Sequence, residues 1–418
     1  MEVFVPQTVS LWRDVERIVS DALRDASPDA AVRRAIDELP YPEGKLVLVA
    51  IGKAAWQMAA SALDALGDRV DDGIVITKRG CAEGPLGKLT ICEAGHPVPD
   101  QASYDATEEA IRLVEPLGEK DVVLFLVSGG GSALFEKPTI PPEEIAALTE
   151  RLLACGASIV EINALRKRLS AVKGGRFAEI CAPARVFSIL LSDIVGDPLD
   201  MIASGPAYPD ASTCEQAARI VEKYRLDLSE RARKQLAIET PKKLDNVETR
   251  ATGSVKYLCQ SAASSCEKLG YFPVLLTDRL SCEAREAGSF LASIVRTSAE
   301  TPRSLAFIVG GEPVVHLTGK GLGGRAQELV LSAAREIAGL ENVALFSFGS
   351  DGTDGPTDAA GAVCDGESAE KLEKLGFDIF ETLRDNDSHR ALKAIDTLIK
   401  TGPTGTNVND LTCALIKR

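Results

Sequence analysis

Five short apolar runs, each ending at Gly, Ser, Asp, Glu or Lys, constrain the fold of this chain more than any other feature. They are rich in Val, Ile, Leu and Phe and do not alternate with polar residues, which is typical of strands buried on both faces of a parallel sheet flanked by helices. The runs are residues 45–51, 121–127, 186–191, 305–309 and 343–348. The sequence therefore predicts an α/β protein.

The residues that follow these runs are the first candidate site residues, because ligands of open α/β sheets bind beyond the carboxyl ends of the strands. Any single βα turn needs glycine, so one such loop alone would also fit a simple turn. Taken together, the loops favour an enzyme with a small-molecule site. The residues in question are Lys53, then Ser128, Gly129, Gly130, Gly131 and Ser132, then Asp193, and then Glu312.

The last run leads into a loop, residues 349–361, that contains Asp351, Asp354 and Asp358 among four glycines and Pro356. Carboxylates on a tightly turning loop are hard oxygen ligands, suited to a divalent cation or to a substrate hydroxyl. A solvated polar turn would also explain each of them singly. We expect Asp351 and Asp354, together with Asp193, to be the metal ligands.

Two basic segments stand out in this acidic chain. The first is residues 161–176, in which a helix is predicted to end at Gly174 and Gly175. Its Arg166 and Lys173 fit either anion binding or cations placed at the negative end of a helix. Residues 319–325 precede a second predicted helix, residues 325–338. There Gly323 and Gly324 would let an anion approach the first N–H groups, and Arg325 would add charge. This segment also matches GxGxxG, whereas the chain has no P-loop motif.

Composition excludes several classes of protein. The net charge of −14 argues against nucleic acid or an anionic membrane as a partner. We expect a cytoplasmic protein, because the N-terminus lacks the features of a signal peptide and no apolar stretch approaches membrane-spanning length. The ten cysteines contain no CxxC and indicate reduced thiols, and the three histidines have no zinc-site spacing.

The length of 418 residues indicates two or three domains. The polar segment 238–250 is the best candidate boundary. We therefore predict an N-terminal domain over residues 1–240 and a C-terminal domain over residues 241–418.

Longer motifs are spread over nearly the whole chain. They are GKAAW, AGHPVPD, SGGGSALFEKP, LSDIVGDPLDMIASGPAYPD, GGRAQELVLSAA, GSDGTDGPTDAAGA and TGPTGTNVNDL. In this order they resemble the glycerate kinases of the MOFRL type. The resemblance implies a Rossmann-like parallel-sheet domain followed by a smaller α/β (MOFRL) domain, with the active site in the cleft between them. One departure is Ala326, where the family usually has Asn, and a milder one is Ser350, where relatives often have Thr.

The resemblance also implies ATP-dependent phosphorylation of D-glycerate to 2-phosphoglycerate with a divalent cation such as Mg²⁺. In such an enzyme Lys53 and Arg325 would stabilise the transferring phosphoryl group, and Asp193 would activate the hydroxyl or hold the metal. Three further polar residues would contact substrate or nucleotide, although a polar turn explains them almost as well: Thr404, Asn407 and Asn409.

Two other functions remain open at this stage. One is an NAD(P)-dependent hydroxypyruvate reductase, favoured by the GxGxxG match and by the label that some family members carry. The other is a non-catalytic metabolite sensor with the same fold. In each case the partners are small molecules, and a homodimer is compatible with all three functions.

Overall fold

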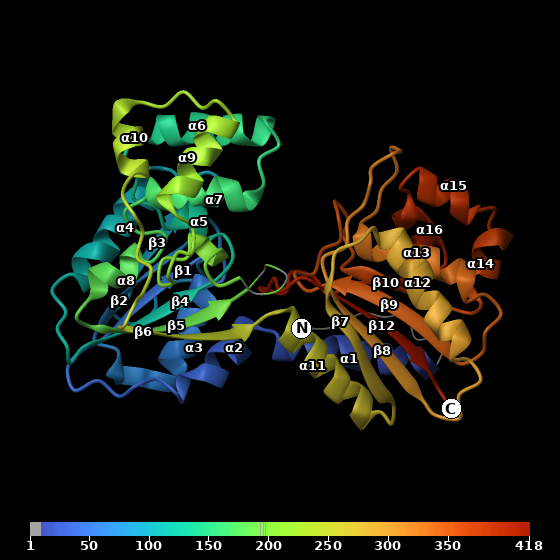
Figure 1. Ribbon diagram of the computed structural model, residues 1–418. Helices are drawn as coiled ribbons and strands as arrows, with labels where there is room; N and C mark the ends of the chain where they lie inside the picture. Colours follow the sequence, from blue (N-terminus) through green and yellow to red (C-terminus); the bar gives the residue numbers. More distant parts are fainter. Residues whose placement is uncertain (1–9, 193, 195, 197) are drawn as a thin grey trace. The chain divides into compact units, whose positions relative to one another are not determined.

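The computed structural model describes residues 10–192, 194, 196 and 198–418, which fall into two compact units (Figure 1). The parallel-sheet unit is Ala31–Thr252. The mixed-sheet unit is Gly253–Arg418 together with the described part of Met1–Ala30. Each unit has its own six-stranded sheet and its own core. No described helix is long and apolar enough to cross a membrane.

In the parallel-sheet unit the strand order is β3-β2-β1-β4-β5-β6, and the first five of these strands pair in parallel. The strands are β1 (Leu46–Ile51), β2 (Asp72–Lys78), β3 (Thr90–Ala94), β4 (Val122–Val127), β5 (Arg185–Leu191) and β6 (Val247–Gly253). The first three apolar runs are therefore buried parallel strands, as predicted. Their carboxyl ends share one edge of the sheet.

Helices cover both faces of this sheet, so alternate residues of β1 enter two different cores. Val47 and Val49 pack with the side of α4 (Gln101–Val114), whereas Leu48 and Ala50 pack with the side of α3 (Ala55–Leu66). Burial on both faces is the physical reason why the strand sequence shows no polar alternation. The remaining helical elements are α2 (Pro28–Ile36), η1 (Gly67–Arg69), α5 (Gly131–Leu134), α8 (Arg176–Cys181) and η2 (Ile202–Ser204).

Four more helices of this unit gather around a separate small core (Figure 1). They are α6 (Pro142–Ala154), α7 (Ile159–Arg168), α9 (Cys214–Lys223) and α10 (Glu230–Leu236). The helix predicted in the basic segment 161–176 is present as α7, but its predicted end at Gly174 and Gly175 is wrong, because α7 ends at Arg168. Gly174 and Gly175, with φ of 58° and 88°, instead form the turn that leads into α8.

In the mixed-sheet unit the strand order is β11-β10-β9-β12-β8-β7. The strands are β7 (Phe272–Leu280), β8 (Leu305–Gly311), β9 (Val343–Gly349), β10 (Gly361–Asp365), β11 (Leu398–Ile399) and β12 (Asp410–Ile416). The last two apolar runs are buried strands, as predicted, but their sheet is not purely parallel. Strand β12 lies between β8 and β9 and is antiparallel to both, so β8 and β9 run in the same direction without touching.

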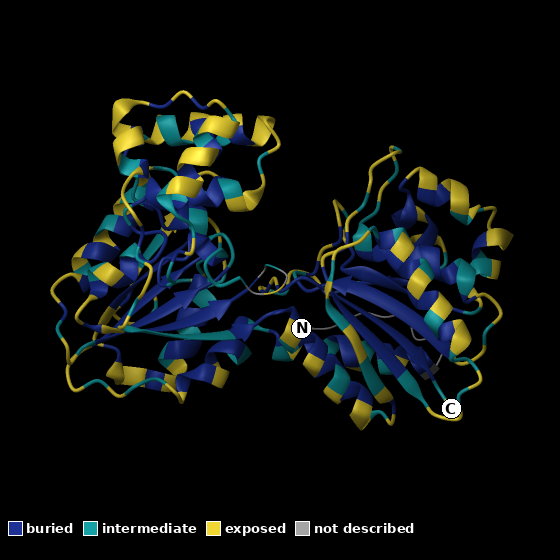
Figure 2. Ribbon diagram, viewed as in Figure 1, coloured by how far each residue is buried: buried dark blue, intermediate teal, exposed yellow. Residues whose placement is uncertain are grey.

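Helices cover both faces of the mixed sheet as well, and Figure 2 shows its central strands buried. One face carries α1 (Ser10–Asp25) and α11 (Val255–Lys268). The other carries α12 (Ala284–Thr297), α13 (Arg325–Glu336), α14 (Ser368–Lys374), α15 (Ile379–Arg384) and α16 (Ser388–Ala394). An antiparallel sheet covered on both faces gives the same unbroken apolar strands as a parallel one. The apolar pattern therefore cannot reveal strand direction.

The division of the chain differs in two ways from the predicted boundary at residue 240. Residues 241–252 contain most of β6, which belongs to the parallel sheet. The N-terminal helix α1 belongs to the mixed-sheet unit, where Val15 and Ile18 are fully buried in a core shared with α11. The periodicity of an amphipathic helix reveals that one face is apolar, but it does not reveal which core that face packs against.

Candidate functional site

Asp410 lies at the centre of the polar cluster in the mixed-sheet unit. As the first residue of β12, it pairs in register with Gly311 at the end of β8 and with Gly349 at the end of β9. Its carboxylate is 2% exposed and accepts two hydrogen bonds from the Arg325 guanidinium, Nε to Oδ2 at 2.5 Å and Nη2 to Oδ1 at 2.9 Å. The antiparallel insertion of β12 thus brings a buried carboxylate to the edge where two other strands end.

Arg325 is held from a second side by Glu312, whose Oε1 accepts from Nη1 at 3.0 Å. Burial raises the pKa of Asp410 to about 7, although Arg325 opposes this shift. Burial also disfavours the charge of Arg325, but the hydrogen bonds with Asp410 keep its pKa above the ordinary value. The sequence predicts that Arg325 is a cation available for phosphate. The structure instead places it between two carboxylates.

Asp410 is not among the predicted site residues, although the neighbouring Asn407 and Asn409 are. It opens the apolar run 410–416, and this position before a buried strand was the available signal.

Asp354 occupies the N-terminus of α13. Its Oδ1 accepts from the N–H of Ala326 at 3.0 Å, and its Oδ2 accepts from the N–H of Gln327 at 2.8 Å and from Gln327 Nε2 at 2.9 Å. The side chain is almost fully buried, and burial raises its pKa although these donors oppose the shift. The predicted anion site at Gly323 and Gly324 is therefore wrong in one respect: an internal carboxylate already uses these helix N–H groups.

The glycines of residues 319–324 also have a role other than ligand binding. A Cβ on Gly319 would lie 2.3 Å from Asp385 Cα, one on Gly321 would lie 2.4 Å from Asp387 Cβ, and one on Gly324 would lie 2.3 Å from Asp354 Cγ. The GxGxxG glycines thus permit close packing of chain on chain. A dinucleotide-binding loop would need that space for pyrophosphate.

A cavity of about 750 Å³ opens over this cluster. Its lining includes six predicted site residues, together with apolar residues of the 313–317 segment. The six are Glu312, Gly323, Gly324, Arg325, Asp351 and Asp354. A Cβ built on Gly349 would lie 3.3 Å from Asp351 Oδ1 and 3.5 Å from Asp410 Oδ1. Two carboxylates therefore direct an oxygen towards the same point at the end of β9. Among the described residues, no group of three or more His, Cys, Asp or Glu side chains is arranged to hold a metal ion.

The segment between β11 and β12 buttresses this cluster. Thr404 Oγ1 donates to the carbonyl of Ser350 at 2.5 Å, and Ser350 Oγ accepts from the N–H of Val408 at 2.8 Å. Asn409, with a φ of 66°, donates from Nδ2 to Glu312 Oε2 at 3.3 Å. Thr404 and Asn409 therefore hold the loops in place, whereas Asn407 is exposed.

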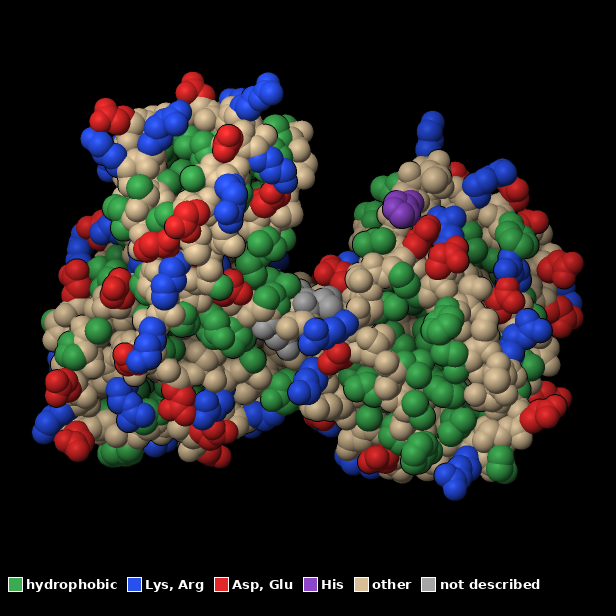
Figure 3. Space-filling model, viewed as in Figure 1, with side chains coloured by type: hydrophobic (Ala, Val, Ile, Leu, Met, Phe, Trp, Pro, Cys, Tyr) green, Lys and Arg blue, Asp and Glu red, His purple; other side chains and the backbone are tan. Residues whose placement is uncertain are grey.

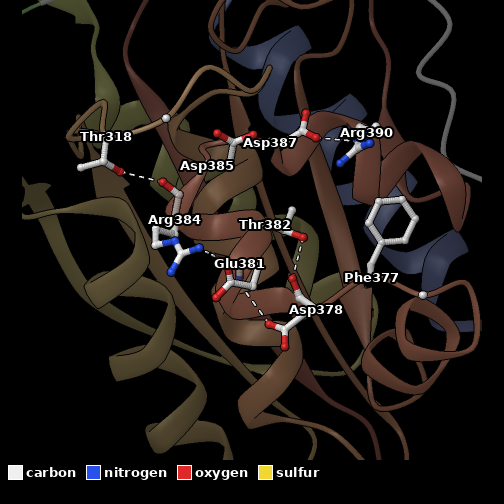
Figure 4. Close-up of a pocket in the computed structure, with 11 residues that line it drawn as sticks. Thr318, Phe377, Asp378, Glu381, Thr382, Arg384, Asp385, Asp387 and Arg390 are labelled. Atoms are coloured by element: carbon white, nitrogen blue, oxygen red, sulfur yellow. Dashed lines mark hydrogen bonds and ion pairs between the residues drawn. The ribbon is translucent and has the colours of Figure 1, made fainter.

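A second cavity of the same unit, also about 750 Å³, lies beside α15 and α16 (Figure 4). Several of the charged side chains that line it already have partners within the cavity wall. Arg390 pairs with Asp387 at 2.5 Å, Arg384 pairs with Glu381, and Asp378 caps α15. No predicted site residue lines it. We therefore place the candidate site of this unit in the cavity lined by Glu312 and Arg325.

The parallel-sheet unit holds the second group of predicted residues, after β1 and β4. The N–H of Lys53 donates to the carbonyl of Gly129 at 2.9 Å, so the two loops are joined, and the Lys53 side chain is exposed. Gly130 has a φ of 86°, which favours glycine, and a Cβ on Gly131 would lie 2.7 Å from Ala203 Cβ. This loop has the tight backbone that the sequence predicted.

The two serines of this loop are engaged within the protein. Ser128 is buried and its Oγ accepts from the N–H of Ala54 at 3.0 Å, which ties the β1 and β4 loops together. Ser132 Oγ lies 2.9 Å from Ser204 Oγ. Ser128 is therefore a structural residue, whereas contact of Ser132 with a ligand stays a prediction.

Basic side chains of the segment around α7 form buried ion pairs. Lys173 Nζ lies 2.9 Å from Glu136 Oε2 and donates to the carbonyl of Phe135 at 2.9 Å. Burial lowers the pKa of Lys173, and Glu136 opposes that shift. Lys173 therefore fits neither of the two predicted roles. The role of Arg166, which is half-buried near the end of α7, stays a prediction. Asp193 lies outside the described residues.

Known proteins match this chain from end to end. Residues 14–237 match the model of a domain of unknown function, DUF4147, and residues 305–410 match that of the MOFRL family. The D-glycerate 2-kinase of Thermotoga maritima is 50% identical over 97% of this chain and 99% of its own length. The glycerate 2-kinase of Pyrococcus horikoshii is 39% identical over 96% of each chain.

A third relative and a solved structure are also similar to this chain. An Agrobacterium vitis protein, provisionally named hydroxypyruvate reductase, is 40% identical over 97% of this chain and 96% of its own. The crystal structure of Thermotoga maritima glycerate kinase superimposes with a TM-score of 0.94 at 49% identity, covering 97% of this chain and 99% of that one.

Proposed function

The chain belongs to the glycerate kinase family that combines DUF4147 and MOFRL domains, and we propose that it transfers a phosphoryl group from ATP to D-glycerate, giving 2-phosphoglycerate. The observation that carries this proposal is 50% identity to a D-glycerate 2-kinase over 97% of the chain. The enzyme is thus a phosphotransferase with an alcohol group as acceptor. The donor, ATP, follows from the kinase reaction.

Arg325 is suited to phosphate binding because of how it is held. Three of its N–H groups donate to Asp410 and Glu312, so two of the five guanidinium N–H groups are left for a ligand in the cavity. A guanidinium fixed on two sides loses little freedom when it binds, which favours transition-state stabilisation. In this proposal Asp410 and Glu312 position Arg325 and do not touch the phosphate.

In the parallel-sheet unit, Lys53 is the cation proposed for the transferring phosphoryl group. The backbone of the loop around Gly130 would bind anionic oxygens through its N–H groups. Asp193, which follows β5, is proposed to accept the proton of the attacking hydroxyl.

The carboxylates partly fit a divalent cation. Mg²⁺ keeps several waters in its shell and is bound by one or two carboxylates together with substrate phosphates, so a cage of three protein ligands is not required. We propose Asp351 as such a ligand; bound with ATP, the ion would neutralise phosphate charge. Asp354 does not fit this role, because three N–H donors occupy its oxygens.

The hydroxypyruvate reductase alternative is weaker on structural grounds. Its support in the sequence is the GxGxxG match, beside the label that some family members carry, and the glycines of that match pack against Asp354 and the segment 385–387. A metabolite sensor would not need Arg325 fixed by two carboxylates on the wall of a cavity.

An assay of the purified protein with D-glycerate, ATP and Mg²⁺ tests the proposal. We expect ADP to form only when all three are present, and ³¹P NMR to place the new phosphate on the 2-hydroxyl. Oxidation of NADH by hydroxypyruvate without ATP turnover would instead support the reductase, and binding of glycerate without either reaction would support the sensor.

We propose a cytoplasmic location as well. Its support is the ten cysteines, all of which have free thiols, several of them buried. A homodimer stays a prediction.

A further inference from the structure

Three basic side chains gather at the carboxyl edge of the parallel sheet, where the motif AGHPVPD has no assigned role. Lys53 follows β1, Lys78 is the last residue of β2, and His96 follows β3. Because these strands are parallel and adjacent in the order β3-β2-β1-β4, their ends lie along one edge beside the Gly130 loop after β4.

The distances at Gly130 show how close this grouping is. A Cβ on Gly130 would lie 3.1 Å from His96 Nε2 and 3.1 Å from Lys53 Cγ. The imidazole and the lysine stem therefore flank the same glycine. Lys78 pairs in register with Ala94, two residues before His96. Burial lowers the pKa of His96, and the charges of Lys53 and Lys78 lower it further.

One carboxylate holds the ends of β2 and β3 in position. Asp100 accepts from Arg79 Nη2 at 2.5 Å, from the N–H of Gly95 at 3.1 Å and, as the cap of α4, from the N–H of Ser103 at 3.1 Å. Arg79 and Gly95 are the immediate neighbours of Lys78 and His96. The backbone next to Lys78 and His96 is therefore held in place by hydrogen bonds before any ligand binds.

The lysines of this group differ from the adjacent Arg79 in their ion pairing. Within residues 31–252, as far as the structure describes them, Lys53 and Lys78 form no ion pair, whereas the adjacent Arg79 pairs with Asp100. Elsewhere acidic and basic side chains are intermingled, as on the face that Figure 3 shows. Like charges gathered without a counter-charge destabilise a fold unless an anion binds there.

We propose that Lys78 and His96, together with Lys53 and the backbone around Gly130, form a binding site for the anionic oxygens of one substrate. This inference rests on the proposed function, which supplies two such groups, the carboxylate of D-glycerate and the phosphates of ATP. Lys78 and His96 are substrate-binding residues in this site, and neither takes part in proton transfer.

Steady-state kinetics of Lys78→Met and His96→Gln identify which substrate binds. Loss of one charge-assisted contact should raise the KM of one substrate about 10-fold or more, with a smaller change in kcat. An effect on the KM of D-glycerate assigns the site to the carboxylate, and an effect on that of ATP assigns it to phosphate. The control is Lys88→Met, an exposed lysine between β2 and β3. If both substrates keep their KM values in Lys78→Met, as in the control, the inference is overturned.

NMR of the histidine side chains separates failure of this inference from failure of the proposed function. The chain has only three histidines, so the His96 signal can be assigned by its loss in His96→Gln. We expect inorganic phosphate, D-glycerate or ATP to shift the His96 signal in the full-length wild type, and Lys78→Met to weaken that response. A response without kinase activity would leave this site standing and remove the proposed function. Kinase activity without any response of His96 would overturn the site alone.

Discussion

At the scale of single residues, the pair formed by Asp410 and Arg325 makes the most direct prediction. The pKa of Asp410 is raised from 3.8 to about 7, so the folded state holds this proton over a range in which the unfolded chain has lost it. Its contribution to stability is therefore complete below about pH 4 and is lost as the pH rises through about 7. We expect the melting temperature of Asp410→Asn to fall less between these pH values than that of the wild type.

The matched variant is Asp358→Asn, whose parent carboxylate is exposed. Hydrogen bonding to Lys400 lowers the pKa of Asp358, so its smaller contribution is lost as the pH falls through that pKa. The two variants should therefore alter opposite ends of the curve of melting temperature against pH. Equal slopes for the wild type and Asp410→Asn would show that Asp410 does not carry this proton.

At the scale of elements, we expect Asp354, at the start of α13, to stabilise the fold and Asp351 to act in catalysis. Asp354 satisfies two backbone N–H groups of a helix whose residues Leu329 to Ala334 lie in the core. Asp354→Ala should therefore cost about 2 kcal/mol or more of folding free energy. Asp351→Asn keeps the acceptor for the N–H of Thr353 and should leave stability unchanged while lowering turnover strongly.

Denaturant unfolding and kcat, measured on the same samples, give both quantities. If Asp354→Ala kept full stability but lost turnover as heavily as Asp351→Asn, Asp354 would be a metal ligand after all.

At the scale of the whole molecule, the two units should respond separately to core substitutions. Ile18 in α1 is fully buried in the core shared with α11. Ile18→Ala should cost about 2–5 kcal/mol. Amide exchange measured by mass spectrometry should become faster in α1, α11 and the mixed sheet, with no change in β1 and β4.

Val49→Ala, in the parallel sheet, is the matched variant and should show the reverse pattern. Faster exchange of β1 and β4 in Ile18→Ala would support the original boundary, in which α1 belongs to residues 1–240.

Much of the fold and part of the site follow from the sequence alone. An unbroken apolar run can be recognised locally because burial on both faces excludes polar residues, and all five runs are strands. The tight loops after β1, β4, β8 and β9 follow in the same way, since glycine marks a backbone that must turn or pack closely. The family motifs identified the reaction for a similar reason, because they are long and local in sequence.

Only the tertiary structure decided what these residues contact. Strand direction depends on hydrogen bonds between distant segments, so nothing local placed β12 between β8 and β9 or brought Asp410 to Arg325. Asp354 and the α13 N-terminus lie 28 residues apart, and their pairing turned a predicted metal ligand into a helix cap. Lys53, Lys78 and His96 come from three different strand ends, and they lie along one edge because neighbouring parallel strands share it. The charge of a residue is a property of the sequence, but whether that charge is neutralised or left for a ligand depends on neighbours that only folding supplies.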